Sequence, residues 1–320
     1  MAKKTVTVLS AGIICFLIVA CIHFFSSTDT EQILIKVKKG DSFTSVAMRL
    51  KGNKLIHSKD LFLGVVKLTK SQNKLKAGVY SFSKKDGMFK ILKNLKNGSK
   101  NTLRFTVPEG NNIKQVADIV AQTIDIDKEK FVKIAQDKNL EGYLMPETYF
   151  VVPGETEEDI IKMMGDEFNK KIMPEMYERA KEMNVAFKDI VIMASIIEKE
   201  TVAREERQMI AAVFYNRLKK RIRLQSCATV LYAMGVNKAK LTIEDTKFDS
   251  PYNTYRHFGL PPGPICNPGI ESIKAALYPT STRSLFFVSD GNGRHLFAKN
   301  LVEHKQNRQK VNLKKKEQKN

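Results

Sequence analysis

The stretch Met193 to Val202 reads MASIIEKETV, an apolar run that closes on two glutamates, Glu198 and Glu200. At 100° per residue, a helix from Asp189 to Thr201 carries apolar side chains around nearly its whole circumference. The pattern predicts a helix that is buried on almost all sides. Burying carboxylates is costly, so the two glutamates at its end need a physical reason.

The two glutamates lie about 200° apart on this helix, so they point to opposite sides and at most one of them serves a catalytic cleft. Glu200 falls between the directions of Met193 and Ile196, inside the apolar circumference. A carboxyl against apolar walls has its pKa raised and can stay protonated as a general acid. Glu200 is therefore the candidate acid. The alternative is that both glutamates form the solvated end of a helix.

The segment after these glutamates, AREERQMIAAVFYNRLKKRIRLQ, predicts a second helix with acids in its first turn and bases in its last, as the helix dipole favours. Asn216 shares a side of this helix with Met209 and Phe214, which leaves an amide near a buried seam. Farther on, LFFVSDGNGRHLF predicts a hairpin that turns at DGNG.

Between these elements, SPYNTYRHFGLPPGPICNP reads as a loop stiffened by proline and glycine. Aromatic faces together with amide and hydroxyl groups suit a sugar ring, which has an apolar face and polar edges. The candidate substrate contacts on this loop are Tyr252, Asn253, Thr254 and Tyr255.

The N-terminal half shows a short internal repeat. VKKGDSFTSVAMRL from Val37 and VPEGNNIKQVADIV from Val107 both read as strand, glycine turn, polar cap and amphipathic helix, although such turns are common. KAGVYSFSKK and FKILKNLKNG add a strand and a helix that Gly98 ends. These elements predict a small α+β module over residues 33–123. Its first unit resembles the LysM fold, a carbohydrate-binding module of bacterial wall proteins.

The stretch from Asp125 to about Asp189 has a mostly helical pattern, interrupted at EGYLMPETYF and VVPGE. GYLMPETY brings two tyrosines and the carboxylate of Glu147 into a segment bent by proline. This segment either lines a sugar site or forms a packed corner.

Composition narrows the class of partner. Lys+Arg 54 against Asp+Glu 34 gives a net charge of +20, which suits nucleic acid, an anionic membrane or an acidic wall polymer. The sequence has no zinc-finger spacing and no phosphate-binding glycine loop, which disfavours nucleic acid. Cys227 and Cys266 lack ligand spacing, so we expect no metal and no cofactor.

The N-terminus predicts a membrane anchor. After a short cytoplasmic tail of residues 1–5, residues 6–25 are uncharged and long enough to cross a bilayer as one helix. Lys3 and Lys4 mark the cytoplasmic side, so the rest of the chain is expected outside. A cleaved signal peptide is the alternative, and the stretch ending at Cys21 faintly resembles a lipoprotein processing site.

Several stretches together carry a family resemblance. The chain resembles the YceG-like family of membrane-anchored endolytic murein transglycosylases from about residue 33 to 304. The matching stretches, in order, are KAGVYSF, GYLMPETY, MASIIEKET, VFYNRL, RLQSCATVLYAMG, SPYNTYRHFGLPPGPICNPG, ESIKAALYP and LFFVSDGNGRHLF.

The resemblance carries a catalytic acid onto the second glutamate of EKET, Glu200, in agreement with the helical wheel. The Glu-Thr pair also resembles the Glu-Ser pair of other lytic transglycosylases. Three features depart from the family: Cys227-Ala228 stands where Asp-Pro is usual, Lys305 stands where Asn is usual, and a basic tail follows. The first departure argues against an essential carboxylate in that turn, while Gln225 stays a candidate substrate contact.

The resemblance implies an α+β protein with one transmembrane helix, a LysM-like module, a mixed helical and β catalytic domain over residues 124–304, and a basic tail over residues 305–320. The implied reaction cleaves the β-1,4 bond between N-acetylmuramic acid and N-acetylglucosamine within nascent peptidoglycan strands. It leaves 1,6-anhydro ends and limits strand elongation. Its implied partners are glycan strands and peptidoglycan synthases of the elongation or division machinery, at the outer face of the bacterial cytoplasmic membrane.

Two rival functions stay open. A muramidase-type hydrolase needs a second carboxylate, for which Glu147 is the best candidate, although we interpret this residue as a substrate contact or a structural residue. A non-catalytic wall-binding scaffold would instead function through the LysM-like unit and would tolerate the loss of Glu200.

Overall fold

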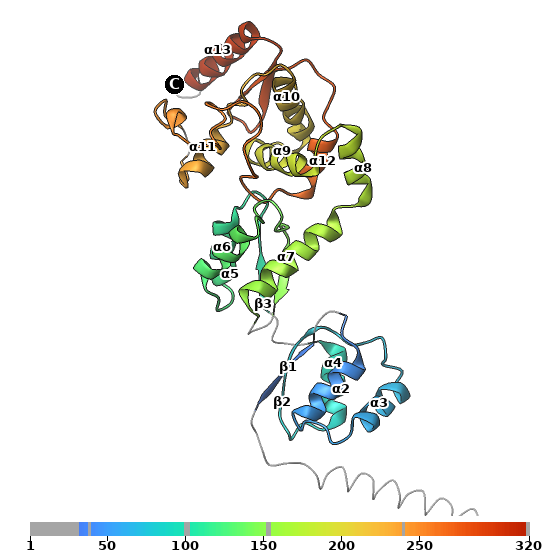
Figure 1. Ribbon diagram of the computed structural model, residues 1–320. Helices are drawn as coiled ribbons and strands as arrows, with labels where there is room; N and C mark the ends of the chain where they lie inside the picture. The colour runs from blue at the N-terminus through green and yellow to red at the C-terminus, as the bar shows by residue number, and fades with distance from the viewer. Residues whose placement is uncertain (1–31, 38–39, 99–102, 152–154, 239–240, 318–320) are drawn as a thin grey trace, which may run out of the picture. The chain divides into compact units, whose positions relative to one another are not determined.

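Figure 1 shows a computed structural model of the chain, which has a mixed α+β fold with small two-stranded sheets. The structure describes residues 32–37, 40–98, 103–151, 155–238 and 241–317. The chain divides into two compact units. The first unit comprises Met1–Arg104 with Phe150–Gly154, and the second comprises Phe105–Tyr149 with Glu155–Asn320.

The first unit has the element order strand, helix, helix, strand, helix. Its elements are β1 (Ile33–Val37), α2 (Phe43–Gly52), α3 (Lys59–Leu68), β2 (Gly78–Phe82) and α4 (Met88–Asn97). β1 and β2 pair antiparallel, with Ile35 opposite Tyr80. Phe62, Phe82 and other apolar side chains from all three helices and both strands form one buried core. This core forms because every element presents one apolar face to the others.

The second unit is mostly helical. In chain order it includes the second half of β3 (Leu103–Thr106), α5 (Ile113–Ala121), α6 (Lys128–Asp137), the first half of β4 (Thr148–Val151), α7 (Glu157–Lys171), α8 (Pro174–Glu182), α9 (Phe187–Glu200), η1 (Arg204–Glu206), α10 (Arg207–Lys219), α11 (Cys227–Met234), η2 (Asp245–Lys247), α12 (Ile270–Leu277), β5 (Phe286–Ser289), β6 (His295–Ala298) and α13 (Leu301–Glu317). β3 forms a sheet with β4, and β5 forms the predicted antiparallel hairpin with β6.

Helix α9 forms the centre of the second unit, as its sequence predicts. Every residue from Ile190 to Ile197 is buried, and α8, α10, α11 and α12 all contact this helix. The helix is apolar on all sides because neighbours cover all of its sides. Its polar end therefore has a fixed direction within the unit.

Local capping explains both predicted strand-helix units. Ser42 and Ser45 form a capping box at the start of α2, and Asn112 and Gln115 form another at the start of α5. In each box, two side chains satisfy backbone N–H groups that the first turn of a helix leaves without partners. Gly98 ends α4, as the sequence predicts, and has a φ of +99°.

Two boundaries differ from the sequence analysis. The first unit ends at Arg104, whereas we expected a module that ends at Thr123. The reason is that α5, the second strand-helix repeat, packs against α6 in the second unit. The expected basic tail, residues 305–320, is instead largely part of α13, which packs against β5 and β6 and buries Val311.

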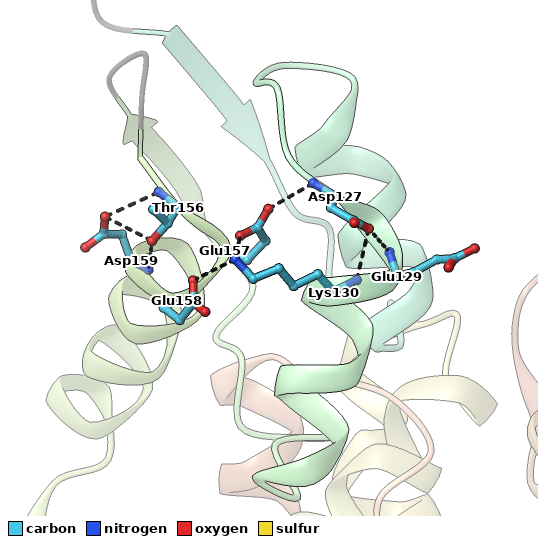
Figure 2. A network of polar contacts seen from close by, with 7 residues as sticks. All are labelled: Asp127, Glu129, Lys130, Thr156, Glu157, Glu158 and Asp159. Atoms are coloured by element: carbon cyan, nitrogen blue, oxygen red, sulfur yellow. Dashed lines mark hydrogen bonds and ion pairs between the residues drawn. The ribbon is translucent and has the colours of Figure 1, made fainter.

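Figure 2 shows how the starts of α6 and α7 are joined. The Glu157 carboxyl accepts the backbone N–H of Asp127 at 2.9 Å and pairs with the Lys130 amine at 2.7 Å. The same amine lies 3.6 Å from the Glu158 carboxylate. Glu157 is buried, and its partners lower the pKa of its carboxyl even though burial opposes this. It is therefore a carboxylate with a structural role.

The predicted membrane span, residues 6–25, lies outside the described residues, as do Lys3 and Lys4. Within the part of the chain that the structure describes, no helix combines the length and apolar character that crossing a bilayer requires.

One side chain joins three loops of the second unit. The buried Asn267 accepts the N–H groups of Gly142 and Leu144 through its Oδ1, at 3.0 and 2.9 Å, and donates its Nδ2 to the Asn111 carbonyl at 2.9 Å. Its backbone N–H donates to the same carbonyl, and its own carbonyl accepts the Gly110 N–H, both at 2.9 Å. The loop before α5, the loop after α6 and the loop before α12 are thus held together.

We expect Asn267→Ala to lower the free energy of unfolding by about 2–5 kcal/mol, because it leaves buried N–H groups without acceptors. Urea denaturation of the purified protein measures this. Asn111→Ala is the matched control, because the Asn111 side chain makes one exposed bond, to the Pro108 carbonyl. Equal losses in the two variants would contradict the proposed role of the Asn267 amide.

Candidate active site

The end of α9 opens into a cavity of about 540 Å³. Its lining includes Glu141, Lys199, Glu200, Cys227, Tyr232 and Tyr252. These residues come from four parts of the second unit: the loop after α6, the end of α9, helix α11 and the loop that follows η2. The cavity therefore contains two carboxyl groups next to aromatic side chains.

Glu200 is held at the N-terminus of α11. The Ser226 hydroxyl donates to its Oε1 at 2.5 Å, and the Ala228 backbone N–H also bonds to this carboxyl. Burial raises the pKa of the Glu200 carboxyl, although the bond from Ser226 and the nearby charges of His295 and Arg217 partly lower it. The net direction is upward, so Glu200 retains its proton to a higher pH than an exposed glutamate.

A buried hydroxyl network sets the position of Ser226. Its backbone N–H donates to the Thr254 Oγ1 at 3.0 Å, and its carbonyl accepts the Thr229 hydroxyl at 2.8 Å. The two threonine hydroxyls lie 2.9 Å apart. Because Ser226 in turn bonds to Glu200, the SPYNTY loop orients the candidate acid through two hydrogen bonds.

Glu198 has a different environment, as the helical wheel predicts. Its carboxylate accepts the Arg207 guanidinium at 3.2 Å and the Gly269 N–H at the start of α12 at 2.9 Å. The side chains of Glu198 and Arg207 are 7% and 9% exposed, so the ion pair is almost wholly buried. Glu198 therefore joins α9 to α10 and α12, while Glu200 lines the cavity.

Glu141 is the second carboxyl of the cavity, and the sequence analysis did not select it. Its oxygens accept the Ile113 N–H at 3.2 and 3.3 Å, and its Oε2 accepts the Tyr232 hydroxyl at 3.2 Å. Burial raises the pKa of Glu141 to about 7, despite these donors. Glu141 is the first residue of EGYLMPETYF. Nothing in the sequence around it separates it from an exposed glutamate, and only the folded structure shows that it lines the cavity.

The predicted aromatic contacts lie at or beside the cavity. Tyr252 is part of its lining, with its ring 5.1 Å from that of Tyr232. The Tyr255 hydroxyl lies 3.2 Å from the Cys227 sulfur, another lining residue. Burial raises the pKa of Tyr255, which keeps its hydroxyl protonated as a hydrogen-bond donor.

Other predicted contacts use their polar atoms within the fold. Asn216 donates to the carbonyls of Thr282 and Ser284, at 2.9 and 3.0 Å. Asn253 is fully buried and donates to the carbonyls of Thr246 and Phe248, at 3.0 and 2.7 Å. With Thr254 they support the loops around the site, since buried amides and hydroxyls need internal partners.

Two more predicted contacts lie outside the cavity lining. Glu147 is exposed and pairs with Lys171 at 2.5 Å. Gln225 has an exposed side chain and a φ of +50°, and its backbone N–H bonds to the Thr254 carbonyl at 3.1 Å. The Gln225 backbone thus helps to place the next residue, Ser226.

Sequence reasoning also missed the charged groups around Glu200. Arg217 is buried, donates to the carbonyls of Leu285 and Leu224 at 2.7 and 2.6 Å, and contributes positive charge near Glu200. His295 on β6 bonds through Nδ1 to the Glu206 carboxylate at 2.7 Å. Both lie in quoted motifs, VFYNRL and GNGRHLF, but nothing in their spacing links them to Glu200.

Comparison with known proteins identifies the family of this chain. A family model described as the YceG-like family matches residues 35–310. The chain belongs to the YceG-like family. The endolytic murein transglycosylase of Bacillus subtilis strain 168 is 36% identical over 304 residues, which cover 86% of this chain and 84% of that protein.

Two further relatives extend the comparison. The endolytic murein transglycosylase of Streptococcus pneumoniae serotype 2 is 29% identical, over 87% of this YceG-like chain but only 58% of the pneumococcal protein. A crystal structure of a YceG-like protein from Listeria monocytogenes is 33% identical, with a TM-score of 0.59, over 86% of this chain and 98% of that one.

The environment of Glu141 predicts a pH dependence of stability. Its pKa is about 7 in the folded chain against an ordinary value of 4.5, so the folded state binds a proton that the unfolded state releases. Stability therefore falls as pH rises from about 4.5 to about 7, by up to about 3 kcal/mol. Glu141→Gln removes this contribution.

Urea denaturation at several pH values measures the stability difference between wild type and Glu141→Gln. We expect wild type to lose stability relative to the variant across that pH range. A difference that stays constant from pH 4.5 to 7 would show that the Glu141 carboxyl titrates as an exposed group does.

Proposed function

We propose that this chain is an endolytic lytic transglycosylase that cleaves peptidoglycan between N-acetylmuramic acid and N-acetylglucosamine. The observation that carries this proposal is the Glu200 carboxyl, which lines a cavity, is held by Ser226 and has its pKa raised by burial. The relatives named endolytic murein transglycosylase support it.

One carboxyl is sufficient for this reaction. Protonated Glu200 gives its proton to the glycosidic oxygen as the bond from that oxygen to the muramoyl C1 breaks. The C6 hydroxyl then bonds to C1, and its proton returns to the Glu200 carboxylate. The products are a 1,6-anhydro end and a new 4-hydroxyl end. No water is consumed, and cleavage within nascent strands limits their length.

A muramidase-type hydrolase is the second candidate, because the cavity contains a second carboxyl, Glu141. In a hydrolase that residue must be ionised to activate water or attack the sugar. Burial raises the pKa of Glu141 to about 7, so its carboxyl keeps a proton to a higher pH than an ordinary glutamate does. This favours the mechanism that uses Glu200 alone. A non-catalytic scaffold is disfavoured because it has no need of a protonated carboxyl in a cavity.

We expect Glu200→Gln to reduce cleavage by about 10²–10⁴, because glutamine keeps the shape but has no proton to transfer. The measurement is mass spectrometry of products from purified glycan strands. Wild type should release 1,6-anhydro ends, and reducing ends would favour the hydrolase.

Glu198→Gln is the matched control, two residues away on the same helix. It breaks a buried ion pair, so we expect a stability loss of about 3 kcal/mol with much of the cleavage per folded molecule retained. Inactive Glu198→Gln beside active Glu200→Gln would reverse the assignment of the acid.

We also propose that residues 6–25 form a single membrane anchor and that the bulk of the chain faces outward. The uncharged span and the preceding Lys3 and Lys4 support this orientation. Protease added to intact spheroplasts should degrade the chain from about residue 30 onward. Protection of the bulk of the chain would contradict the orientation.

The first unit is proposed as a LysM-like wall-binding module that does not take part in the chemistry. Its support is the strand, helix, helix, strand order and the location of both cavity carboxyls in the second unit. Deleting residues 32–98 should leave cleavage of soluble strands and reduce binding to intact walls. Loss of all cleavage in a folded deletion variant would contradict this.

The cellular partners are proposed to be peptidoglycan synthases of the elongation or division machinery. An enzyme that cuts nascent strands has its substrate where these synthases release it. The net charge of +20 suits the anionic surfaces of the membrane and the wall.

A further inference from the structure

Two tyrosines and a carboxyl form one wall of the cavity, apart from the Glu200 carboxyl and its donors. The rings of Tyr232 and Tyr252 lie 5.1 Å apart at an angle of 48°, and both residues are half-buried. Tyr232 comes from α11 and Tyr252 from the loop after η2, so two separate elements bring the rings together. Such a pair presents an apolar surface with polar edges.

Glu141 lies beside this pair, because the Tyr232 hydroxyl donates to its Oε2 at 3.2 Å. The N–H of Ile113 is shared between its two oxygens at 3.2 and 3.3 Å, and the N–H of Gly142 is a third protein donor. A carboxylate accepts about four hydrogen bonds, so this arrangement leaves accepting capacity on a group that lines the cavity.

Glu157 shows what a purely structural carboxyl looks like in the same unit. It accepts one backbone N–H, from Asp127, and its other oxygen is neutralised by Lys130 (Figure 2). Glu141 likewise accepts a backbone N–H at a helix start, but its other donors are neutral. Within the described residues, Glu141 thus lines the cavity and has no cation among its hydrogen-bond partners.

We propose that Glu141, Tyr232 and Tyr252 form a sugar-binding subsite that holds one amino-sugar ring of the glycan strand next to the bond that Glu200 cleaves. The tyrosine rings pack against the apolar face of the pyranose, and Glu141 accepts a hydrogen bond from a sugar hydroxyl or acetamido N–H. This subsite rests on the proposed function and assigns its substrate contacts. Glu141 binds the substrate and transfers no proton in the reaction.

The test measures binding separately from cleavage. Full-length protein that carries Glu200→Gln is titrated with purified, peptide-free glycan strands, alone and combined with Glu141→Gln. At ~pH 8, above the pKa of the Glu141 carboxyl, we expect the second substitution to weaken binding roughly tenfold, the size of one lost charge-assisted hydrogen bond. Glutamine keeps the volume and one acceptor oxygen, so the variant retains the Ile113 contact and folds.

Two further variants separate the ring from the hydroxyl. Tyr232→Phe keeps the aromatic surface, and we expect binding within about twofold of the parent. Tyr232→Ala removes the surface, and we expect a loss of roughly tenfold. Glu157→Gln is the matched control for a buried carboxyl outside the cavity, and it should alter the melting temperature without altering glycan binding.

In the active enzyme, Glu141→Gln should raise KM roughly tenfold and change kcat by less than about threefold. Unchanged glycan affinity in the Glu141→Gln variant would overturn the subsite while leaving the proposed function intact. A fall in kcat as large as that of Glu200→Gln would also overturn it, because Glu141 would then take part in the chemistry. If the Glu200→Gln protein bound no glycan and wild type cut none, the proposed function would fail together with the subsite.

Discussion

The second unit depends on the buried amide of Asn267. Five hydrogen bonds from this one residue hold the segments at Gly110–Asn111 and Gly142–Leu144 against the loop that precedes α12. A larger residue does not fit at Gly142, because its φ is +88° and an added Cβ would lie 2.6 Å from Pro264. Glu141 directly precedes Gly142, and Ile113 lies two residues after Asn111, so the same hydrogen bonds also position two residues of the cavity lining.

Another part of the cavity lining depends on how α9 ends. Burial on all sides fixes the direction of this helix, and the Glu198 ion pair with Arg207 fixes its last turn. Glu200 then meets the start of α11, where Ser226 and the Ala228 N–H hold its carboxyl. These donors favour the charged form, whereas burial favours the neutral form and has the larger effect. A held but protonated carboxyl is what a general acid requires.

The sequence predicted the parts of this site that local periodicity determines. The buried helix, the opposed directions of Glu198 and Glu200, the hairpin and both capped strand-helix units follow from spacing within single elements. Glu141 could not be found this way, because its carboxyl becomes significant only when α5 and α11 bring Ile113 and Tyr232 to it. The inward hydrogen bonds of Asn253 and Thr254 could not be predicted either, because the sequence of a rigid loop does not show whether a polar side chain faces a ligand or bonds within the fold.

Three acidic side chains near α9 show that partners, and not burial alone, decide what a carboxyl can do. Glu198 has an arginine, so its charge is balanced and its role is structural. Glu200 has a hydroxyl and a backbone N–H that hold it in place, while burial raises the pKa of its carboxyl despite the positive charges nearby. Among the described residues, Glu141 has only neutral donors, so burial outweighs them and raises its pKa to about 7. In the proposed reaction one carboxyl gives a proton and takes it back, and this suits Glu200 because neutral donors, the Ser226 hydroxyl and the Ala228 N–H, hold it in place.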